Sequence, residues 1–487
     1  MMTLSQLLPQ LSGNGLSARI QGPAQVEFRN VSIDTRTLEP GALYVALRGP
    51  RFDGHEFAPA ARERGAVALL VERPVPVDLP QLIVTDARRA LGHIAAHWRA
   101  RFSLPVIAVT GSNGKTTTTQ MIAAIFAQAY GEREGRPCWF ATRGNRNNEI
   151  GVPLMLLELR HEHRAAVLEL GMNHPGEIRI LSEWAQPSVA LVTNAQREHQ
   201  EFLDSVEATA HENGLAITAL PATGTAVFPA DDACAPIWRK LAGTRRTFDF
   251  ALHGAAAVRA DYRLGVHACQ LDIRTPGGSI STELALGGEH NVRNALAASA
   301  GCLAIGIGTG AIAAGLARFR PVGGRGTRRP ARGGACLIDE SYNANPDSVR
   351  AAIDLLAQHQ GHRVLVFGDM GEVGSRAEEF HREIGVYARE RGIDRLLALG
   401  PQSQFAVAAF GAGASHFDTV EELIAAASAI AQGAATAAGA AGDDTSTALT
   451  FLVKGSRFMR MERVIAALEQ DGRSNAMQSP GAPQNHA

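Results

Sequence analysis

The segment TGSNGKTTTT, residues 110–119, combines the residue types that bind phosphate. It follows the apolar run PVIAV and precedes QMIAAIFAQAY, which predicts a strand, a glycine turn and the start of a helix. Backbone N–H groups in such a turn form an anion site, where Lys115 would reach the β- and γ-phosphates and the Thr116 hydroxyl would bind Mg²⁺. The nucleotide-binding residues predicted from this segment are Gly111, Ser112, Asn113, Gly114, Lys115, Thr116 and Thr117.

This loop is a short variant of the Walker pattern, because Val109 stands where the strict pattern requires glycine. The alternative interpretation is a glycine turn that binds nothing. Lysine usage favours a functional loop. The chain has 47 lysines plus arginines, of which only Lys115, Lys240 and Lys454 are lysines. A lysine kept among so many arginines indicates a site that needs a compact ammonium group.

Further polar side chains follow predicted strands, and ligands of open α/β sheets gather at the carboxyl ends of strands. Glu169 ends AAVLELG and could bind Mg²⁺ beside the phosphates. His199 lies in the loop after VALVTN and could serve a metal or an acyl phosphate. A solvated carboxylate and a solvated histidine are the alternatives. Asn291 and Asn294 open a helix, which they could cap, or they could bind an adenine edge.

Alternating strands and helices predict an α/β protein with mostly parallel sheets. We expect a first domain over residues 1–103, a central nucleotide-binding domain over 104–318 and a smaller α/β domain over 319–470. The Gly-, Pro- and Arg-rich segment 318–334 marks the second boundary. The low-complexity segment 429–447 predicts a surface loop, and the tail 471–487 lacks the apolar content to order itself.

The overall composition excludes several classes of protein. The net charge of −1 gives no basic field for nucleic acid, and the five cysteines lie far apart without a C-x-x-C pair, which fits a reducing cytosol better than disulfides or a zinc site. The N-terminus has no signal-peptide pattern. The uncharged run 294–317 is long enough to span a membrane, but GIGTG interrupts it, so we expect two short buried helices instead.

Taken together, the motifs resemble the Mur ligase family over residues 25–468: TGSNGKT, ELGMNHPGEI, TNAQREH, HNVRNALAA, DESYNANPDS, FGDMGEVG and LVKGSR. SYNANP with KGSR is more specific than the phosphate loop. DTRTLEPGALYVALRGPRFDGHEF and GNRNNEIGVP resemble the members that add D-alanyl-D-alanine to UDP-N-acetylmuramoyl-tripeptide (UDP-MurNAc-tripeptide). The resemblance implies a UDP-substrate domain, an ATPase domain and a C-terminal Rossmann-like domain in a cytoplasmic, monomeric enzyme.

The resemblance also implies a reaction with ATP and Mg²⁺, in which a substrate carboxylate becomes an acyl phosphate that the dipeptide amine attacks. Lys115, Glu169 and His199 match catalytic positions, and Thr116, Glu169 and His199 match metal positions. Asn291 and Asn294 match adenine contacts, Arg325 a phosphate contact and Asp339 a ribose contact. The residues matched to the UDP-substrate are Asp34, Thr35, Arg36, Asn145, Asn147, Asn148 and Glu149. Our candidates for binding D-alanyl-D-alanine are Tyr342, Asn345, Lys454 and Arg457.

One position departs from the family. Counting without gaps from the histidine of REH, the family's carbamylated lysine falls on Asn213, and no lysine lies nearby. Asparagine cannot form a carbamate, so a second metal would be held with water or Glu212, or bound more weakly. We therefore predict activity without bicarbonate.

Other functions share parts of this pattern. A sister ligase that adds the third amino acid, or a folylpolyglutamate synthase, would have the same ATPase centre. A phosphate-loop switch that makes no bond is a further alternative, and two additional domains with polar strand ends argue against it.

Overall fold

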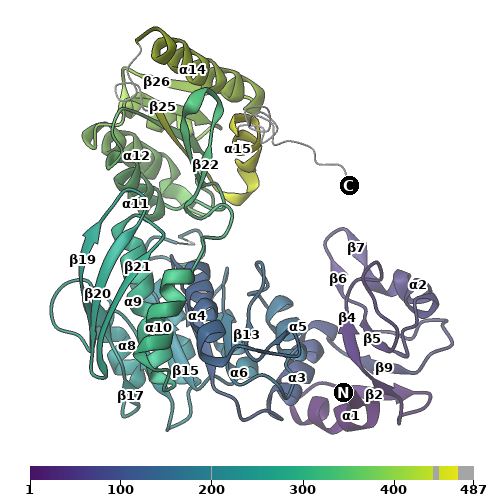
Figure 1. The fold of residues 1–487 in the computed structure, drawn as a ribbon. Helices are drawn as coiled ribbons and strands as arrows, with labels where there is room; N and C mark the ends of the chain where they lie inside the picture. The colour runs from purple at the N-terminus through teal and green to yellow at the C-terminus, as the bar shows by residue number, and fades with distance from the viewer. Residues whose placement is uncertain (199, 442–448, 470–487) are drawn as a thin grey trace, which may run out of the picture.

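The chain folds into three α/β domains in sequence order, each built around its own sheet (Figure 1). The computed structural model describes residues 1–198, 200–441 and 449–469. This architecture confirms the predicted fold class. The domain boundaries stay predictions, and the predicted disordered tail lies outside the described residues.

The N-terminal domain is built on a sheet of order β2-β9-β8-β5-β4, in which β2 is antiparallel and the other strands are parallel. Its central strands are completely buried runs, ALYV and ALLV, as expected for parallel strands covered on both faces. The elements are β1 (Met2–Thr3), α1 (Leu4–Gly13), β2 (Ala18–Gln21), β3 (Glu27–Phe28), β4 (Asn30–Ser32), β5 (Ala42–Val45), β6 (Arg48–Gly49), β7 (Phe52–Asp53), η1 (Gly54–Phe57), α2 (Ala58–Glu63), β8 (Ala68–Val71), β9 (Gln81–Val84) and α3 (Ala87–Arg99).

The central domain has a parallel sheet of order β13-β14-β10-β15-β16-β17. Alternate residues of β10 enter two cores, Ile107 and Val109 on one face and Val106 and Ala108 on the other. The elements are β10 (Val106–Thr110), α4 (Lys115–Tyr130), β11 (Glu132–Arg133), β12 (Arg136–Pro137), β13 (Phe140–Ala141), α5 (Gly151–Leu157), β14 (Ala166–Glu169), α6 (Glu177–Ala185), β15 (Val189–Val192), α7 (Val206–Thr218), β16 (Thr225–Val227), α8 (Ala235–Ala242), β17 (Arg246–Thr247), β18 (Phe250–Ala251), β19 (Val258–Leu264), β20 (Cys269–Thr275), β21 (Gly278–Leu284), α9 (Glu289–Ala304) and α10 (Thr309–Arg318).

Residues 250–284 depart from the predicted alternation of strands and helices. They form a second sheet, β18-β19-β20-β21, whose last three strands are antiparallel. Burial alternates strictly along β20, because one face covers the core and the other faces solvent. The uncharged run 294–317 forms α9 and α10, as predicted, and no helix in the described part of the chain is long and apolar enough to cross a bilayer.

The C-terminal domain has a sheet of order β22-β23-β27-β24-β25-β26, parallel except for β22. The predicted surface loop over 429–447 is wrong as far as Ala441, because α14 continues through it, and alanine has the highest helix propensity. Its last residues, 442–447, lie outside the described part. The elements are β22 (Thr327–Pro330), η2 (Arg332–Gly334), β23 (Cys336–Glu340), α11 (Pro346–Ala357), β24 (His362–Gly368), η3 (Gly374–Arg376), α12 (Ala377–Glu390), β25 (Arg395–Leu399), α13 (Ser403–Phe410), β26 (Ala414–Phe417), α14 (Val420–Ala441), β27 (Leu449–Lys454), η4 (Arg457–Met459) and α15 (Glu462–Leu468).

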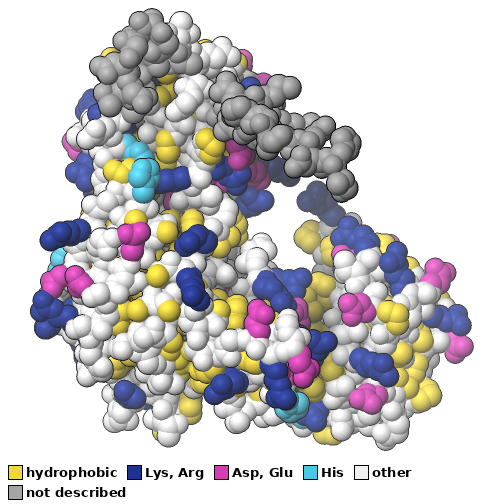
Figure 2. Space-filling model, in the orientation of Figure 1, with side chains coloured by type: hydrophobic (Ala, Val, Ile, Leu, Met, Phe, Trp, Pro, Cys, Tyr) yellow, Lys and Arg dark blue, Asp and Glu magenta, His cyan; other side chains and the backbone are white. Residues whose placement is uncertain are grey.

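The central domain carries the other two domains at opposite ends (Figure 1). The space-filling view shows an open hollow between the N-terminal and C-terminal domains, with Lys and Arg side chains along its margin (Figure 2). The phosphate loop begins at the carboxyl ends of the central parallel strands. Both the N-terminal and the C-terminal domain lie next to the domain that carries this loop.

Candidate active site at the phosphate loop

The phosphate loop connects the middle strand β10 to α4, as predicted from TGSNGKT. Two of its glycines have positive φ, +121° at Gly111 and +81° at Gly114. A Cβ at Gly111 would lie 2.1 Å from the Thr193 hydroxyl, and one at Gly114 would lie 2.1 Å from Asn294 Oδ1. Both the backbone conformation and the close neighbours require glycine. The loop thus opens a helix N-terminus, with Thr116 and Thr117 in its first turn.

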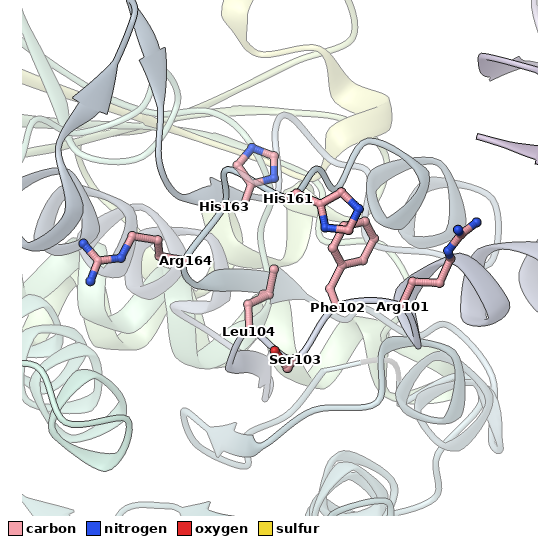
Figure 3. A pocket seen from close by; sticks show the side chains of 7 residues that line it. All are labelled: Arg101, Phe102, Ser103, Leu104, His161, His163 and Arg164. Carbon is pink, nitrogen blue, oxygen red and sulfur yellow. The ribbon is translucent and has the colours of Figure 1, made fainter.

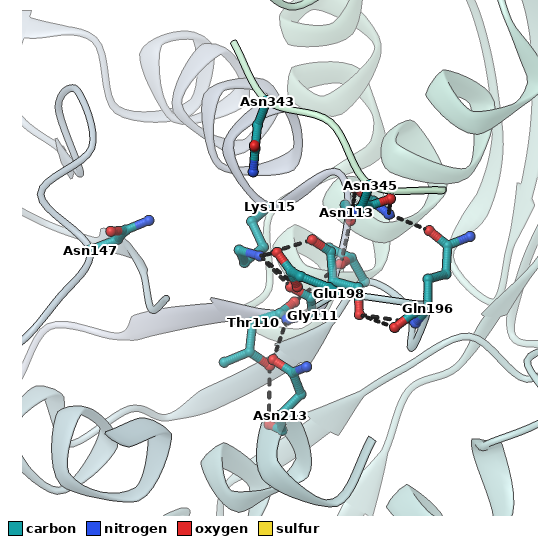
Figure 4. Close-up of polar contacts among 12 residues, drawn as sticks. Thr110, Gly111, Asn113, Lys115, Asn147, Gln196, Glu198, Asn213, Asn343 and Asn345 are labelled. Carbon is teal, nitrogen blue, oxygen red and sulfur yellow. Dashed lines mark hydrogen bonds and ion pairs between the residues drawn. The ribbon is translucent and has the colours of Figure 1, made fainter. Parts of the chain in front are cut away.

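Lys115 folds back over the loop that carries it (Figure 4). Its ammonium group donates to the carbonyl oxygens of Gly111 at 2.6 Å and Ser112 at 2.9 Å, and it pairs with Glu198 at 3.1 Å. The Lys115 and Glu198 side chains are only 15% and 11% exposed. A bound triphosphate would have to replace Glu198 as the partner of this ammonium group.

Asn213 supports the loop from below. Its side-chain oxygen accepts the Gly111 N–H at 2.8 Å, and its backbone carbonyl accepts the Thr110 hydroxyl at 3.1 Å. The residue is 1% exposed. Its neighbour Glu212 is directed elsewhere, since its carboxylate accepts the Gly176 N–H at the start of α6 at 2.9 Å. Asn213 therefore holds the phosphate loop in place with a neutral side chain.

The loop after β15 wraps around the phosphate loop. Asn194 Oδ1 accepts the Asn113 N–H at 2.9 Å, and Gln196 Oε1 accepts from the Asn113 amide at 2.6 Å. This segment also holds Glu198, which sequence analysis missed even though it stands beside the singled-out His199. His199 itself lies outside the described residues, so its predicted metal or acyl-phosphate position is untested.

Glu169 ends β14 directly beside β10, in register with Val109. It is 2% exposed, and its Oε1 accepts the side-chain amide of Asn147 at 2.7 Å. Its Oε2 is buried and has no hydrogen-bond partner among the described residues. A buried carboxylate oxygen with an open coordination position suits a divalent cation, so the residues here fit Mg²⁺.

The predicted adenine contacts lie against the same loop. Asn291 and Asn294 are both buried in the first turns of α9, and the Asn294 amide donates to Asn291 Oδ1 at 3.2 Å. The Thr118 hydroxyl of α4 donates to Asn294 Oδ1 at 3.5 Å. Packing of α4 on α9 thus brings together two segments that lie far apart in the sequence.

The C-terminal domain reaches the phosphate loop through Asn345. The amides of Asn345 and Asn113 bond to each other reciprocally, at 3.0 and 3.2 Å. Asn345 also caps α11 by accepting the Ser348 N–H at 2.9 Å. Nearby, the guanidinium groups of Arg325 and Arg457 lie 4.0 and 5.8 Å from the centre of the Tyr342 ring. These contacts place Asn345 on the phosphate loop and bring Arg325, Tyr342 and Arg457 together within the C-terminal domain.

Two other predicted residues of this domain are engaged internally. Asp339 is 4% exposed and accepts the Ser341 hydroxyl at 2.6 Å. Lys454 is 3% exposed, donates to the Asn343 carbonyl at 2.9 Å and lies 3.6 Å from Glu340. Burial lowers the pKa of Lys454, and Glu340 opposes that shift. Both side chains are thus held in place by contacts within the C-terminal domain.

The predicted UDP-substrate residues fall into two groups. Asp34, Thr35 and Arg36 form a turn after β4 in the N-terminal domain, where hydrogen bonds from Arg36 lower the pKa of Asp34 to about 2. The other group precedes α5 in the central domain: Asn145 is exposed, Asn147 binds Glu169, Asn148 caps the helix start and Glu149 pairs with Arg88 of the N-terminal domain.

Two cavities lie away from the phosphate loop. One of about 320 Å³ lies at the opposite end of the central sheet, and its charged side chains Arg101 and Arg164 point away from each other (Figure 3). The other, of about 350 Å³, lies in the N-terminal domain and includes Arg48 and Arg88 in its lining. Arg88 in the lining of the second cavity pairs with Glu149, one of the predicted UDP-substrate residues.

Comparison with known proteins decides the family. Residues 27–99 match the family model described as "Mur ligase family, catalytic domain", 109–302 match "Mur ligase middle domain", and 324–457 match "Mur ligase, glutamate ligase domain". The UDP-N-acetylmuramoyl-tripeptide--D-alanyl-D-alanine ligase of Escherichia coli (strain K12) is 40% identical over 97% of this chain and 99% of its own length. The chain belongs to the Mur ligase family.

Solved Mur ligase structures share the whole architecture. A crystal structure of MurF from Acinetobacter baumannii has a TM-score of 0.86 and 33% identity, covering 95% of this chain and 98% of its own. MurF from Thermotoga maritima, in complex with ADP, has a TM-score of 0.77 and 25% identity over 91% and 97% of the two chains. As a Mur ligase, this chain has the fold that the motifs predicted.

Proposed function

We propose that this chain joins D-alanyl-D-alanine to UDP-MurNAc-tripeptide with ATP, which completes a peptidoglycan precursor in the cytoplasm. The observation that carries the proposal is the 40% identity to a ligase of that name over 97% of this chain. The glycine loop and the Glu169 oxygen that has no partner among the described residues support it, because activating a carboxylate needs a phosphate site with a cation beside it.

The proposed reaction has two steps. A carboxylate oxygen of the tripeptide attacks the γ-phosphorus of ATP and the bond to ADP breaks, which leaves an acyl phosphate. The amine of D-alanyl-D-alanine then attacks the acyl carbon, loses a proton and expels phosphate. Lys115 and the loop N–H groups neutralise and orient the transferring group. Thr116 and Glu169 would hold Mg²⁺, which supplies positive charge against the phosphate oxygens when bound.

The proposed binding residues assign each part of the substrates to a domain. The UDP-substrate would be held by Asp34, Thr35 and Arg36 of the N-terminal domain and by Asn145, Asn147, Asn148 and Glu149 of the central domain. Asn291 and Asn294 would hold the adenine, and Arg325 and Asp339 the phosphate and ribose. Tyr342, Asn345, Lys454 and Arg457 would bind the dipeptide. His199 would hold a second metal or the acyl phosphate, and we propose that the enzyme works as a monomer.

Mass spectrometry of the product from UDP-MurNAc-tripeptide, D-alanyl-D-alanine and ATP tests this proposal. We expect a mass increase equal to the dipeptide minus water, with one ADP released per product. Diaminopimelate, lysine or glutamate accepted in place of the dipeptide would identify a sister ligase or a folate-type enzyme instead. Phosphate release that does not depend on any acceptor would identify a nucleotide switch.

A further inference from the structure

Asn147 occupies an unexpected place for a residue predicted to hold the UDP-substrate. Its side-chain amide donates to Glu169 Oε1 at 2.7 Å, although the two residues belong to different segments. Glu169 Oε2 is left buried and without a partner among the described residues. The Asn147 amide therefore binds one oxygen of the Glu169 carboxylate, and the other oxygen can still accept a ligand.

The surrounding backbone holds Asn147 in this place. The Gly171 N–H, two residues beyond Glu169, donates to the Asn147 carbonyl at 2.8 Å. A Cβ at Gly171 would lie 2.9 Å from Asn147 Nδ2, so a side chain there would push the amide away from its present position. The Glu169 N–H is fixed as well, since it donates to the Thr142 hydroxyl at 2.9 Å.

The same loop is anchored on its other side. Asn148 Oδ1 accepts the Gly151 N–H at 2.9 Å and so caps α5, and Glu149 forms an ion pair with Arg88 of the N-terminal domain. Asn147 thus belongs to a braced loop that lies between the N-terminal domain and β14. Such a loop can fix a carboxylate more firmly than solvent can.

We propose that Asn147 is a positioning residue for Glu169, fixing Oε1 so that Oε2 serves as the cation ligand. The inference rests on the proposed function, in which Glu169 holds Mg²⁺. A carboxylate with one oxygen tied down loses little further rotational freedom when it binds a cation. Removing such supporting hydrogen bonds typically weakens metal binding by about 10- to 100-fold.

The experiment measures Mn²⁺ affinity by electron paramagnetic resonance, using the full-length protein saturated with the non-hydrolysable ATP analogue AMPPCP. Asn147→Ala removes the side-chain amide. Gly171→Ala keeps the asparagine at position 147 but pushes its amide away from Glu169. Asn145→Ala is the matched control, because Asn145 is an exposed asparagine on the same loop. Glu169→Gln reports whether the carboxylate binds the cation at all.

We expect Asn147→Ala and Gly171→Ala to weaken Mn²⁺ binding about tenfold and Asn145→Ala to leave it unchanged. Asn147→Ala should also raise the Mg²⁺ concentration for half-maximal rate, with kcat recovering at saturating Mg²⁺, which general damage to the fold would not allow. If Asn147→Ala does not fold, Gly171→Ala decides the question.

Two outcomes separate this inference from the proposed function. Wild-type Mn²⁺ affinity in Asn147→Ala and Gly171→Ala, together with a loss in Glu169→Gln, overturns the role of Asn147 alone. Wild-type affinity in Glu169→Gln overturns the assignment of Glu169 as the cation ligand, and this inference with it, whereas the proposed ligase reaction is decided by the product assay.

Discussion

Lys115 is held by a carboxylate at the position where the proposed reaction requires phosphates. The Glu198 pair is largely shielded from water, so it is stronger than an exposed ion pair. Nucleotide binding has to break it, and Glu198 then presents its negative charge to the incoming phosphates. We therefore expect Glu198 to weaken the binding of ATP to the loop.

Glu198→Gln should tighten binding of AMPPCP about tenfold, or about 1.4 kcal/mol, because the charge that competes for Lys115 is gone. Isothermal titration calorimetry measures this affinity. Glu201→Gln, which neutralises an exposed carboxylate on the same loop, should bind like the wild type. Weaker binding by Glu198→Gln would show that Glu198 assists the nucleotide instead.

Turnover should not depend on bicarbonate, because the amide of Asn213 already holds the Gly111 N–H and cannot be carbamylated. The measurement compares steady-state rates in buffer stripped of CO₂ with rates after bicarbonate is added. Equal rates are expected. A rate that collapses in stripped buffer and returns with bicarbonate would contradict the prediction.

At the scale of elements, α11 places its N-terminal cap against the phosphate loop. Asn345 forms a capping box with Ser348 and also bonds to Asn113. One side chain therefore stabilises a helix of the C-terminal domain and joins that helix to the nucleotide site. These two roles can be separated, because Ser348 takes part only in the capping box.

Asn345→Ala and Ser348→Ala should both lower the melting temperature, since losing an N-cap interaction costs about 1 kcal/mol. Only Asn345→Ala should also raise KM for ATP, because it alone removes the contact with Asn113. Differential scanning calorimetry and steady-state kinetics provide the two readouts. Equal KM values for ATP in the two variants would mean that the Asn113–Asn345 pair has no part in ATP binding.

Local sequence signals predicted the elements better than the contacts between them. The phosphate loop and its flanking strand and helix follow from a few adjacent residues, and so do the buried strands. The sheet over 250–284 was not predicted, because the pattern of alternating strands and helices on either side of it was assumed to continue across this segment. The pairs Asn147–Glu169 and Asn113–Asn345 join distant segments, so no local pattern could reveal them.

For the molecule as a whole, Arg197 connects the central domain to the C-terminal domain through several contacts. Its guanidinium group bonds to Asp347 at 2.6 Å and to Glu383 at 2.6 Å, and it lies 5.3 Å from the Phe380 ring centre. Its backbone N–H also donates to Asp347 at 2.9 Å. Arg197 directly precedes Glu198. The residue that holds the C-terminal domain is therefore adjacent in sequence to the residue that pairs with Lys115.

Arg197→Ala should increase the radius of gyration of the free enzyme, because the C-terminal domain loses its charged anchor. Small-angle scattering measures this change. Arg376→Ala is the matched control: Arg376 lies 4.6 Å from the same ring but pairs with Glu379 inside the C-terminal domain. Identical scattering from Arg197→Ala and the wild type would show that other contacts hold the domain.

We also expect the junction 318–324 to act as a hinge when the ligands bind. AMPPCP together with the UDP-substrate should then make the wild-type particle more compact. Unchanged scattering profiles with and without these ligands would contradict the hinge.

The scarcity of lysine has a practical consequence. Lys115 and Lys454 are sheltered inside the protein, whereas Lys240 is exposed on α8. Among the lysines, amine-directed coupling under mild conditions should therefore attach a dye or a sensor surface at Lys240, while the α-amino group of Met1 on the N-terminal domain is a second reactive amine. Neither attachment point lies on the nucleotide loop.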